Sequence, residues 1–446
     1  MQKKERTQPA RLKGFRDYLP EAMAARMAMI DVIRCAAALA GFQVIGTPAL
    51  EYAVTLLGQG GGETDKQVYR FKDLGDRDVA LRFDLTVPFA RFVAEHQNDL
   101  AFPFKKLQIG DVWRGENTQK GRYREFCQCD LDIIGVDSAA ADIEILTVFQ
   151  RILGALDVGG FTQAVGHRLI LSALIRKLLR IDGGAGEAAA LIALDKLAKV
   201  GPEQVLALLG AIAGADTGGG AVLLELLASK DSAGHTDMEL VATELKDDTA
   251  SLKEIDRLRF VVATAAAAAS AGPEALRIDL TVARGLGYYT GIVFETTLTN
   301  QPGFGSISSG GRYNDLAGRF TSRELPGVGG SIGLDRLLSA LEEMERLKSQ
   351  LVKPVFVAVA TADALGYAFE LVGTLRAAGI AADIGMVAKL GLQFKHADRL
   401  GSPLVVTVGG SEKEQRTFAL KTMKDGSERR DLPASGVVEL VRLGLD

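Results

Sequence analysis

The sequence predicts three structural parts: an α+β domain built on an antiparallel sheet, a helical insertion, and a C-terminal α/β domain. The length of 446 residues already indicates several domains, because a chain of this size is too long for one compact core. Strand-like runs with polar faces occupy residues 1–165 and 273–347, and a Leu- and Ala-rich stretch with helical spacing separates them at 166–272. Strands then alternate with helices over 352–446, as in a small, mostly parallel sheet.

The first domain opens with a helix predicted over residues 21–40. Pro20 precedes its first turn and Gly41 follows its end, which is the usual order of these two residues around a helix. Met23, Met27, Ile30 and Ala37 share a stripe of this helix, although Arg34 falls on it too, and the stripe is expected to face the core.

Strands are predicted over residues 42–45, 79–84, 106–114 and 124–135. The polar loop 115–123 joins the last two. These two strands are therefore predicted to form an antiparallel hairpin.

In the insertion, glycine clusters separate helical segments that carry none of the polar groupings found on either side. Beyond it, strands resume at 276–282 and 291–297. The C-terminal domain is predicted from the strands 354–360, 380–386 and 404–408, the helices 362–378 and 392–400, a hairpin turn at Asp425-Gly426 and a final helix from Ala434.

Composition excludes several classes of protein. The formal net charge of −4 argues against affinity of the whole surface for polyanions, so contact with nucleic acid must come from local basic clusters. No stretch approaches the roughly 20 apolar residues that cross a bilayer, and the polar residues 1–16 predict no secretory signal. We therefore expect a protein of the cytoplasm that does not bind membranes.

Three cysteines are too few for a disulfide framework, which favours a reducing compartment. Cys127 and Cys129 form a C-x-C pair, but the scattered histidines do not complete a zinc site. We interpret the pair as structural thiols in a half-buried strand and expect no protein-bound metal.

The predicted hairpin carries the first group of candidate site residues. Arg114 ends one strand, and Gln128 and Asp132 lie at even spacing on the returning strand, so the latter two share a face. A guanidinium, an amide and a carboxylate suit a phosphate or carboxylate beside a cationic group. The same residues would equally fit a solvated hairpin with surface ion pairs.

Two further groups are shorter. Asp84 and Thr86 are predicted to share a strand face, which would give an acceptor pair for an α-ammonium group or simply a polar edge facing water. Arg284 lies in a glycine-rich turn before Tyr288 and Tyr289, which are predicted to point to opposite faces of a strand. A tight turn with aromatic packing would account for the tyrosines but would not require Arg284.

The fourth group is the pair of glycine-rich segments at 308–313 and 327–333, followed by Arg336 in the first turn of a helix. Such strands let a flat ring approach the backbone, and the arginine can then bind phosphate oxygens. A flexible loop before an ordinary helix is the alternative. The glycines do not fit G-x-G-x-x-G with a downstream acid, which disfavours a Rossmann dinucleotide site.

Together these segments resemble the class II aminoacyl-tRNA synthetases, and specifically the histidyl-tRNA synthetase family. Residues 14–20 look like the family's opening motif, and Pro48 takes the place of the motif 1 proline. Residues 112–126 are similar to motif 2, in a wording closer to the eukaryotic-type branch, and 329–336 are similar to motif 3. The two histidine-specific signatures are matched at 284–289 and 310–313.

The resemblance implies the class II catalytic fold and an ATP-dependent ligase that forms histidyl-adenylate from L-histidine and transfers it to the 3′ end of tRNA(His). It also implies Mg²⁺ accompanying ATP, a homodimer, and an anticodon-binding C-terminal domain. In that domain Lys389, Lys395 and Arg399 would contact phosphates or form a solvated helix face.

Roles at the site follow from the resemblance. Arg114 would bind the ATP α-phosphate and the reacting carboxylate, and Arg284 would be a second catalytic cation. Glu116 and Arg122 would place ATP, and Arg336 would hold its γ-phosphate.

For the amino acid, the resemblance assigns the α-amino group to Asp84, Thr86 and Gln128. It assigns the two imidazole nitrogens to Asp132 and Tyr289, with Tyr288 as a wall of the pocket.

Two positions depart from the family pattern: Gly287 replaces the usual aspartate before the tyrosine pair, and Ser331 stands where many class II enzymes carry glycine. Because of Gly287, a catalytically inactive paralogue acting as a histidine or tRNA sensor remains an alternative. The presence of Arg114, Arg284 and Arg336 argues against it, and the paired tyrosines argue against another class II specificity.

Overall fold

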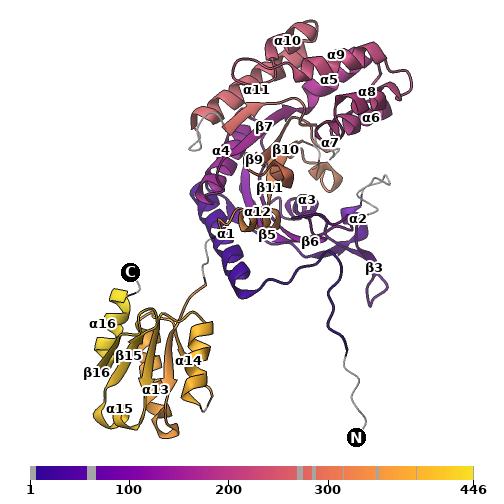
Figure 1. Ribbon diagram of the computed structural model, residues 1–446. Coiled ribbons are helices and arrows are strands. Elements are labelled where there is room, and N and C mark those ends of the chain that lie inside the picture. The colour runs from indigo at the N-terminus through magenta and orange to yellow at the C-terminus, as the bar shows by residue number, and fades with distance from the viewer. Residues whose placement is uncertain are drawn as a thin grey trace. The chain divides into compact units, whose positions relative to one another are not determined.

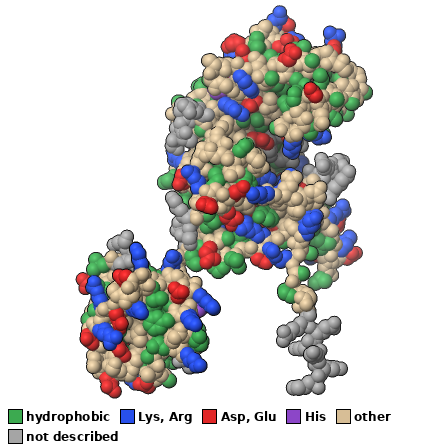
Figure 2. Space-filling model, in the orientation of Figure 1, with side chains coloured by type: hydrophobic (Ala, Val, Ile, Leu, Met, Phe, Trp, Pro, Cys, Tyr) green, Lys and Arg blue, Asp and Glu red, His purple; other side chains and the backbone are tan. Residues whose placement is uncertain are grey.

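The computed structural model describes residues 7–57, 67–268, 275–283, 288–314, 316–347, 351–387 and 389–444. The chain forms two compact units, Met1–Ser349 and Gln350–Asp446 (Figure 1). On the face drawn in Figure 2, lysine and arginine side chains are interspersed with acidic ones over both units. Among the described residues, no helix combines the length and apolarity needed to cross a membrane.

The first unit is built on an eight-stranded sheet in the order β1-β5-β6-β11-β10-β9-β7-β8. Only the outer pairs β1–β5 and β7–β8 are parallel, which confirms the predicted antiparallel sheet and its central hairpin. The strands are β1 Gln43–Val44, β5 Phe104–Trp113, β6 Glu125–Ile134, β7 Phe161–His167, β8 Leu276–Ile278, β9 Ile292–Leu298, β10 Ser306–Tyr313 and β11 Gly327–Gly333. A separate sheet has the order β2-β4-β3, with β2 Leu50–Tyr52, β3 Arg70–Lys72 and β4 Asp78–Leu81.

Helices pack on one face of the large sheet. Helix α1 (Pro20–Leu39) contacts α4 (Ala139–Ala155) and α12 (Leu334–Glu343). It begins and ends one residue earlier than the predicted 21–40, and its buried side chains include Met29 and Ile33, whereas Met23 and Met27 are exposed. Of the predicted stripe, Ala37 is buried and Ile30 is half-buried, so only its two methionines were misplaced. The smaller helices of this unit are α2 Ala53–Leu56, α3 Thr86–Glu95, η3 Pro302–Phe304 and η4 Ala317–Arg319.

The two faces of strand β6 differ in character. Cys127, Cys129 and Leu131 belong to the main hydrophobic core. Gln128, Asp130 and Asp132 alternate with them and therefore point to the other face, as the spacing predicted for Gln128 and Asp132. The two cysteines are buried, as expected of structural thiols, because they lie on the strand face that packs into the core.

The helical insertion emerges from β7. Gly166 and His167 still pair with β9, so the first helix begins at Arg168. The insertion helices lie together at one end of the unit (Figure 1). They are α5 Arg168–Leu179, α6 Gly184–Leu194, α7 Leu197–Val200, α8 Pro202–Gly210, α9 Thr217–Ala228, α10 Met238–Glu244 and α11 Thr249–Ala268.

The segment around Asp84 differs from the prediction. Strand β4 ends at Leu81, and Thr86 is the first residue of α3. Asp84 and Thr86 therefore do not share a strand face. Pro88 fits the first turn of a helix, and the Asp84 carboxylate accepts a hydrogen bond from the Val87 backbone N–H, so the chain turns into a helix where alternation suggested a longer strand.

The second unit is a five-stranded sheet in the order β13-β12-β14-β15-β16. Its first three strands are parallel, and β15 and β16 form the antiparallel hairpin predicted at Asp425-Gly426. The strands are β12 Val355–Val359, β13 Ala382–Ile384, β14 Leu404–Val408, β15 Phe418–Thr422 and β16 Glu428–Leu432. The helices are η5 Ala362–Ala364, α13 Leu365–Ala377, α14 Leu390–Arg399, α15 Gly410–Gln415 and α16 Ala434–Gly444.

Candidate active site

A cavity of about 1770 Å³ opens on the polar face of the large sheet. Its walls come from β6, β10 and β11, from the starts of α3 and α12, and from Ile192 and Lys196 of the insertion. All of the predicted site residues that the structure describes line it: Asp84, Thr86, Arg114, Glu116, Arg122, Gln128, Asp132, Tyr288, Tyr289 and Arg336. Arg284 and Gly287 lie outside the described residues.

Arg114 lies at the end of β5 and is held on several sides. Its Nε donates to the Phe83 carbonyl oxygen at 2.8 Å, and its guanidinium lies 5.2 Å from the centre of the Phe126 ring. Glu116 lies 3.8 Å from the Arg114 guanidinium and also forms an ion pair with Arg122. One carboxylate thus aligns two guanidinium groups along the same wall, an arrangement suited to an anion with several oxygens.

Arg336 faces the same cavity from the first turn of α12, where its guanidinium donates to the Ser306 carbonyl oxygen at 2.6 Å. The neighbouring Asp335 fixes this helix end. Its buried carboxylate accepts from the Cys127 backbone N–H at 2.6 Å and from the Arg26 guanidinium at 3.1 Å. Helix α12 is therefore tied to β6 and α1, which sets the position of Arg336.

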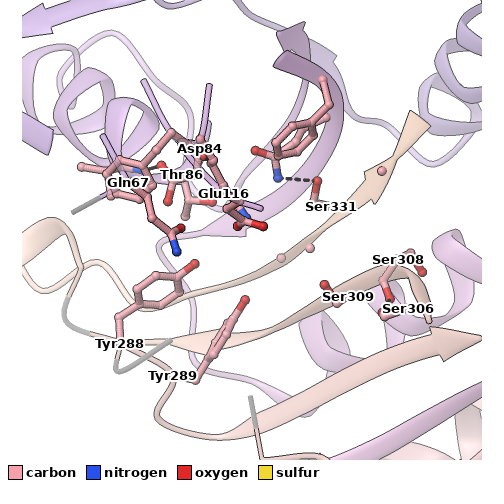
Figure 3. Close-up of a pocket in the computed structure, with 18 of the residues that line it drawn as sticks. Gln67, Asp84, Thr86, Glu116, Tyr288, Tyr289, Ser306, Ser308, Ser309 and Ser331 are labelled. Carbon is pink, nitrogen blue, oxygen red and sulfur yellow. Dashed lines mark hydrogen bonds and ion pairs between the residues drawn. The ribbon is translucent and has the colours of Figure 1, made fainter. Parts of the chain in front are cut away.

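Two residues that line the cavity each keep a buried acceptor oxygen with no hydrogen-bond partner among the described residues. Asp84 uses one oxygen to accept from the Val87 N–H at 3.1 Å, and its other oxygen has no hydrogen-bond partner within the described part of the chain. Gln128 donates to Ser331 Oγ at 2.8 Å (Figure 3), which leaves its side-chain oxygen likewise without a described partner. Unpaired buried acceptors are costly, so this pair is suited to receive donors from a ligand.

Burial raises the pKa of Asp84, while the Val87 N–H and then the nearby Arg114 and Lys106 act to lower it. Ser331, which departs from the family pattern, orients the Gln128 amide. No sequence pattern assigns a role to Ser331.

The Asp132 carboxylate is engaged at both oxygens. Lys106 Nζ lies 2.6 Å from one oxygen, and the Tyr313 hydroxyl donates to the other at 2.6 Å. A Cβ at position 329 would overlap this carboxylate, so Gly329 provides room for it. Sequence reasoning missed Lys106. The alternation of β5 does place Lys106 on the face opposite Leu107, and that is the signal that could have found it.

Tyr288 and Tyr289 both line the cavity, with ring centres 4.7 Å apart. The expectation that they point to opposite faces was wrong, because they precede β9 in a turn where strand alternation does not apply. In Figure 3 their rings enter the cavity from the side opposite Asp84 and Thr86. Gly311 permits this placement, since a Cβ there would lie 2.8 Å from the Tyr289 ring.

Two neighbouring side chains of the segment 310–313 lie in different environments. Tyr313 faces Asp132, whereas Arg312 points towards α4 and binds Asp142 at 2.6 Å in a buried ion pair. Arg257 of the insertion helix α11 joins the same carboxylate at 2.8 Å. This arginine pair links the insertion to the sheet and lies outside the cavity lining.

The comparisons with known proteins agree with this geometry. The model of the family described as histidyl-tRNA synthetase matches residues 14–337. The chain belongs to the histidyl-tRNA synthetase family. A model described as an anticodon binding domain matches residues 354–442, within the second unit.

Relatives of this histidyl-tRNA synthetase family member include a histidine–tRNA ligase of Rhodopirellula baltica, 43% identical over 93% of both chains. Another, from Helicobacter pylori, is 39% identical over 97% of this chain and 98% of its own. Among solved structures, a histidyl-tRNA synthetase from Nostoc sp. PCC 7120 superposes with a TM-score of 0.85 at 28% identity, covering 98% of this chain and 100% of that one.

These matches confirm the predicted family and fold, and they support the ligase rather than the inactive paralogue. The chain is an ATP-dependent aminoacyl-tRNA ligase of the histidine family. Among the described residues, no group of three or more His, Cys, Asp or Glu side chains is arranged to hold a metal ion.

Proposed function

We propose that the cavity binds ATP and L-histidine side by side, forms histidyl-adenylate, and then passes the histidyl group to the 3′ end of tRNA(His). One observation carries this proposal. Arg114 and Arg336, which suit phosphates, line the same cavity as the unpaired acceptors of Asp84 and Gln128, which suit an ammonium group.

On the nucleotide side, Arg114 contacts the α-phosphate and the histidine carboxylate, and Arg336 contacts the γ-phosphate. Glu116 and Arg122 position ATP along the same wall, supported by their ion pair. Arg284 remains a prediction from the sequence as a second cation at the α-phosphate.

On the amino-acid side, Asp84, Thr86 and Gln128 receive the α-ammonium group. Asp132 accepts from one imidazole nitrogen, and the Tyr289 hydroxyl donates to the other. Tyr288 closes the pocket. The proximity of the two tyrosine rings to each other and to the cavity supports this arrangement.

The chemistry requires no protein nucleophile. A histidine carboxylate oxygen attacks the α-phosphorus, the bond to the β-phosphate oxygen breaks, and pyrophosphate leaves. The terminal adenosine hydroxyl of tRNA then attacks the carbonyl carbon of the adenylate and AMP leaves. Arginines fixed beside the α-phosphate stabilise the charge that develops there.

Mg²⁺ would enter with ATP. Glu116 already pairs with Arg122, and the unpaired oxygen of Asp84 is assigned to the ammonium group, so phosphate oxygens would supply most of the ion's ligands. It would neutralise charge on the leaving pyrophosphate.

The finer assignments of partners and compartment are also proposals. A homodimer would cover apolar side chains exposed on the small strands near Pro48, among them Val44, Leu50, Tyr52 and Phe71.

In the second unit, Lys389, Lys395 and Arg399 near α14 would contact anticodon phosphates. The cytoplasm is the proposed compartment.

Pyrophosphate exchange by the full chain tests the function. Histidine should support exchange, and none of the other nineteen amino acids should. Arg114→Ala should slow exchange by about 10²–10³-fold, the effect of removing one group that stabilises transition-state charge. The exposed Arg34→Ala serves as the control and should behave as wild type. Exchange with another amino acid, or an unimpaired Arg114→Ala, would overturn the proposal.

Arg284→Ala should lose about 3–4 kcal/mol of transition-state stabilisation by the same reasoning. A wild-type exchange rate in this variant would remove Arg284 from the mechanism without affecting the rest.

A further inference from the structure

A lysine with no exposed surface lies directly behind the proposed imidazole site. Lys106 is 0% exposed, on the inner side of β5, and its Nζ lies 2.6 Å from Asp132 Oδ2 and 4.6 Å from the centre of the Phe89 ring. Burying an ammonium group without exposure is expensive unless a partner compensates it. This unfavourable burial occurs immediately beside the cavity, and core packing alone does not account for a lysine at this position.

The lysine faces a group of buried carboxylates. Asp84, Asp130 and Asp132 are each at most 4% exposed, and one oxygen of Asp130 has no hydrogen-bond partner in the described part of the chain. Burial raises the pKa of Asp130 to about 7, with Lys106 acting to lower it and Asp132 to raise it. Without the lysine, adjacent carboxylates would compete for a proton.

Asp132 is also fixed in orientation. The Lys106 ammonium and the Tyr313 hydroxyl hold its two oxygens at 2.6 Å each, from β5 and β10 on either side of the pocket floor. Each carboxylate oxygen can accept more than one hydrogen bond, so an imidazole N–H can still be accommodated.

We propose that Lys106 is a positioning residue for substrate recognition: it holds the Asp132 carboxylate in a fixed orientation beside a positive charge and thereby sets the affinity of the pocket for the imidazole ring. This inference rests on the proposed role of Asp132 in binding imidazole. It adds a cation that does not itself line the cavity.

A purely structural ion pair would behave differently. Its loss would lower the melting temperature and leave the bound substrate's affinity per folded molecule unchanged. A positioning role requires a selective change in the KM for histidine, since an interaction that holds ground state and transition state alike affects KM more than kcat.

The test is Lys106→Met, compared with Lys105→Met in the full chain. Lys105 is the matched control, because it is the adjacent lysine of the same strand but pairs with Glu144 at 2.7 Å and is 33% exposed. In pyrophosphate exchange, Lys106→Met should raise the KM for histidine about tenfold, the size of one charge-assisted hydrogen bond, with the KM for ATP unchanged. Lys105→Met should leave both constants unchanged, and Lys106→Arg should recover part of the affinity.

The pH profile gives a second readout. Lys106, Asp130 and Tyr313 face Asp132 from β5, β6 and β10, and Asp84 faces it from the segment before α3. Of these four groups around Asp132, Lys106 carries the positive charge. Its removal should therefore weaken histidine binding more at pH 6.5 than at pH 8.5, because a proton shared by the carboxylates removes the acceptor. A parallel profile in wild type and Lys106→Met would contradict the proposal.

Asp132→Asn and the double variant separate the possible failures. If Lys106 acts through Asp132, the double variant should have the histidine KM of Asp132→Asn alone, and it should be more stable than Lys106→Met because no isolated charge remains. This comparison also holds if Lys106→Met itself folds poorly. If Asp132→Asn leaves the KM unchanged, the proposed imidazole site fails. If it raises the KM while Lys106→Met does not, only the present inference fails.

Discussion

Replacing Asp84 by asparagine tests the proposed ammonium site with little disturbance of the fold. One carboxylate oxygen accepts the Val87 N–H at the start of α3. The other is buried and has no partner among the described residues, in a side chain that lines the cavity. Asparagine can keep the first contact through its carbonyl oxygen. It replaces the second oxygen by an NH₂ group, which cannot accept a donor from the ligand.

The size of the effect follows from the interaction lost. A hydrogen bond to a charged group is worth about 1.5–3 kcal/mol, which corresponds to roughly a 10- to 150-fold change in affinity. The KM for histidine should rise by this factor, and the KM for ATP should not. The melting temperature should stay level or rise, because the variant removes a buried carboxylate that burial disfavours in its charged form.

The sign of the pH effect follows from the raised pKa of Asp84. As the pH falls, this carboxyl takes up a proton earlier than an ordinary aspartate and loses affinity for the ammonium group. Histidine binding by the wild type should therefore weaken relative to Asp84→Asn as the pH falls. Free histidine titrates identically for both proteins, so its own protonation cancels in the ratio.

The assay is pyrophosphate exchange at several histidine concentrations, with Asp78→Asn as the control. Asp78 lies on β4 outside the cavity lining, where Arg70 pairs with it. An unchanged histidine KM in Asp84→Asn, or an equal change in Asp78→Asn, would refute the assignment of Asp84 to the ammonium group.

Three further predictions concern the surrounding structure. Gly329→Ala would place a Cβ into the Asp132 carboxylate, so histidine should no longer raise the melting temperature while ATP still does. Arg312→Met leaves the buried Asp142 with reduced compensation and should cost about 3 kcal/mol in denaturant unfolding; a loss under 1 kcal/mol would contradict this. Asp130 has a folded-state pKa of about 7, above the roughly 3.9 expected when unfolded, so its ionisation lowers stability as the pH rises between those values. The melting temperature of Asp130→Asn should therefore rise relative to that of wild type between pH 5 and pH 8. A melting-temperature difference that stays constant over this range would exclude the raised pKa of Asp130.

Strand alternation was sufficient to predict one face of the site. Gln128 and Asp132 lie two pleats apart on β6, and a spacing of four residues places them on the same side of any regular strand. The hairpin that carries them was predictable as well, because a polar loop between two alternating segments permits few other connections. These features depend only on local geometry.

The site features that were not predicted lie where the alternation of a regular strand ends. Around Asp84, the strand gives way to a helix that begins at Thr86, and no local pattern marks that boundary except Pro88. Tyr288 and Tyr289 lie in a turn, so period-two reasoning assigned them to opposite faces wrongly. Lys106 was missed for a different reason: a fully buried lysine is rare, and a lysine in an exposed-looking strand is normally assigned to solvent.

The unfavourable features of the cavity are consistent with the proposed binding of an ammonium group. Asp84 and Gln128 each keep a buried oxygen without a described partner, and Asp130 is buried beside Asp132 with a raised pKa. In the free protein these groups lower stability, since each gave up water without gaining a full set of hydrogen bonds. In the proposed complex, the ammonium group of histidine supplies donors to the free oxygens of Asp84 and Gln128 and recovers part of that loss on binding. On this proposal, the free energy lost in folding the polar face of the sheet contributes to selective affinity, because a ligand without the ammonium group leaves the same oxygens unsatisfied.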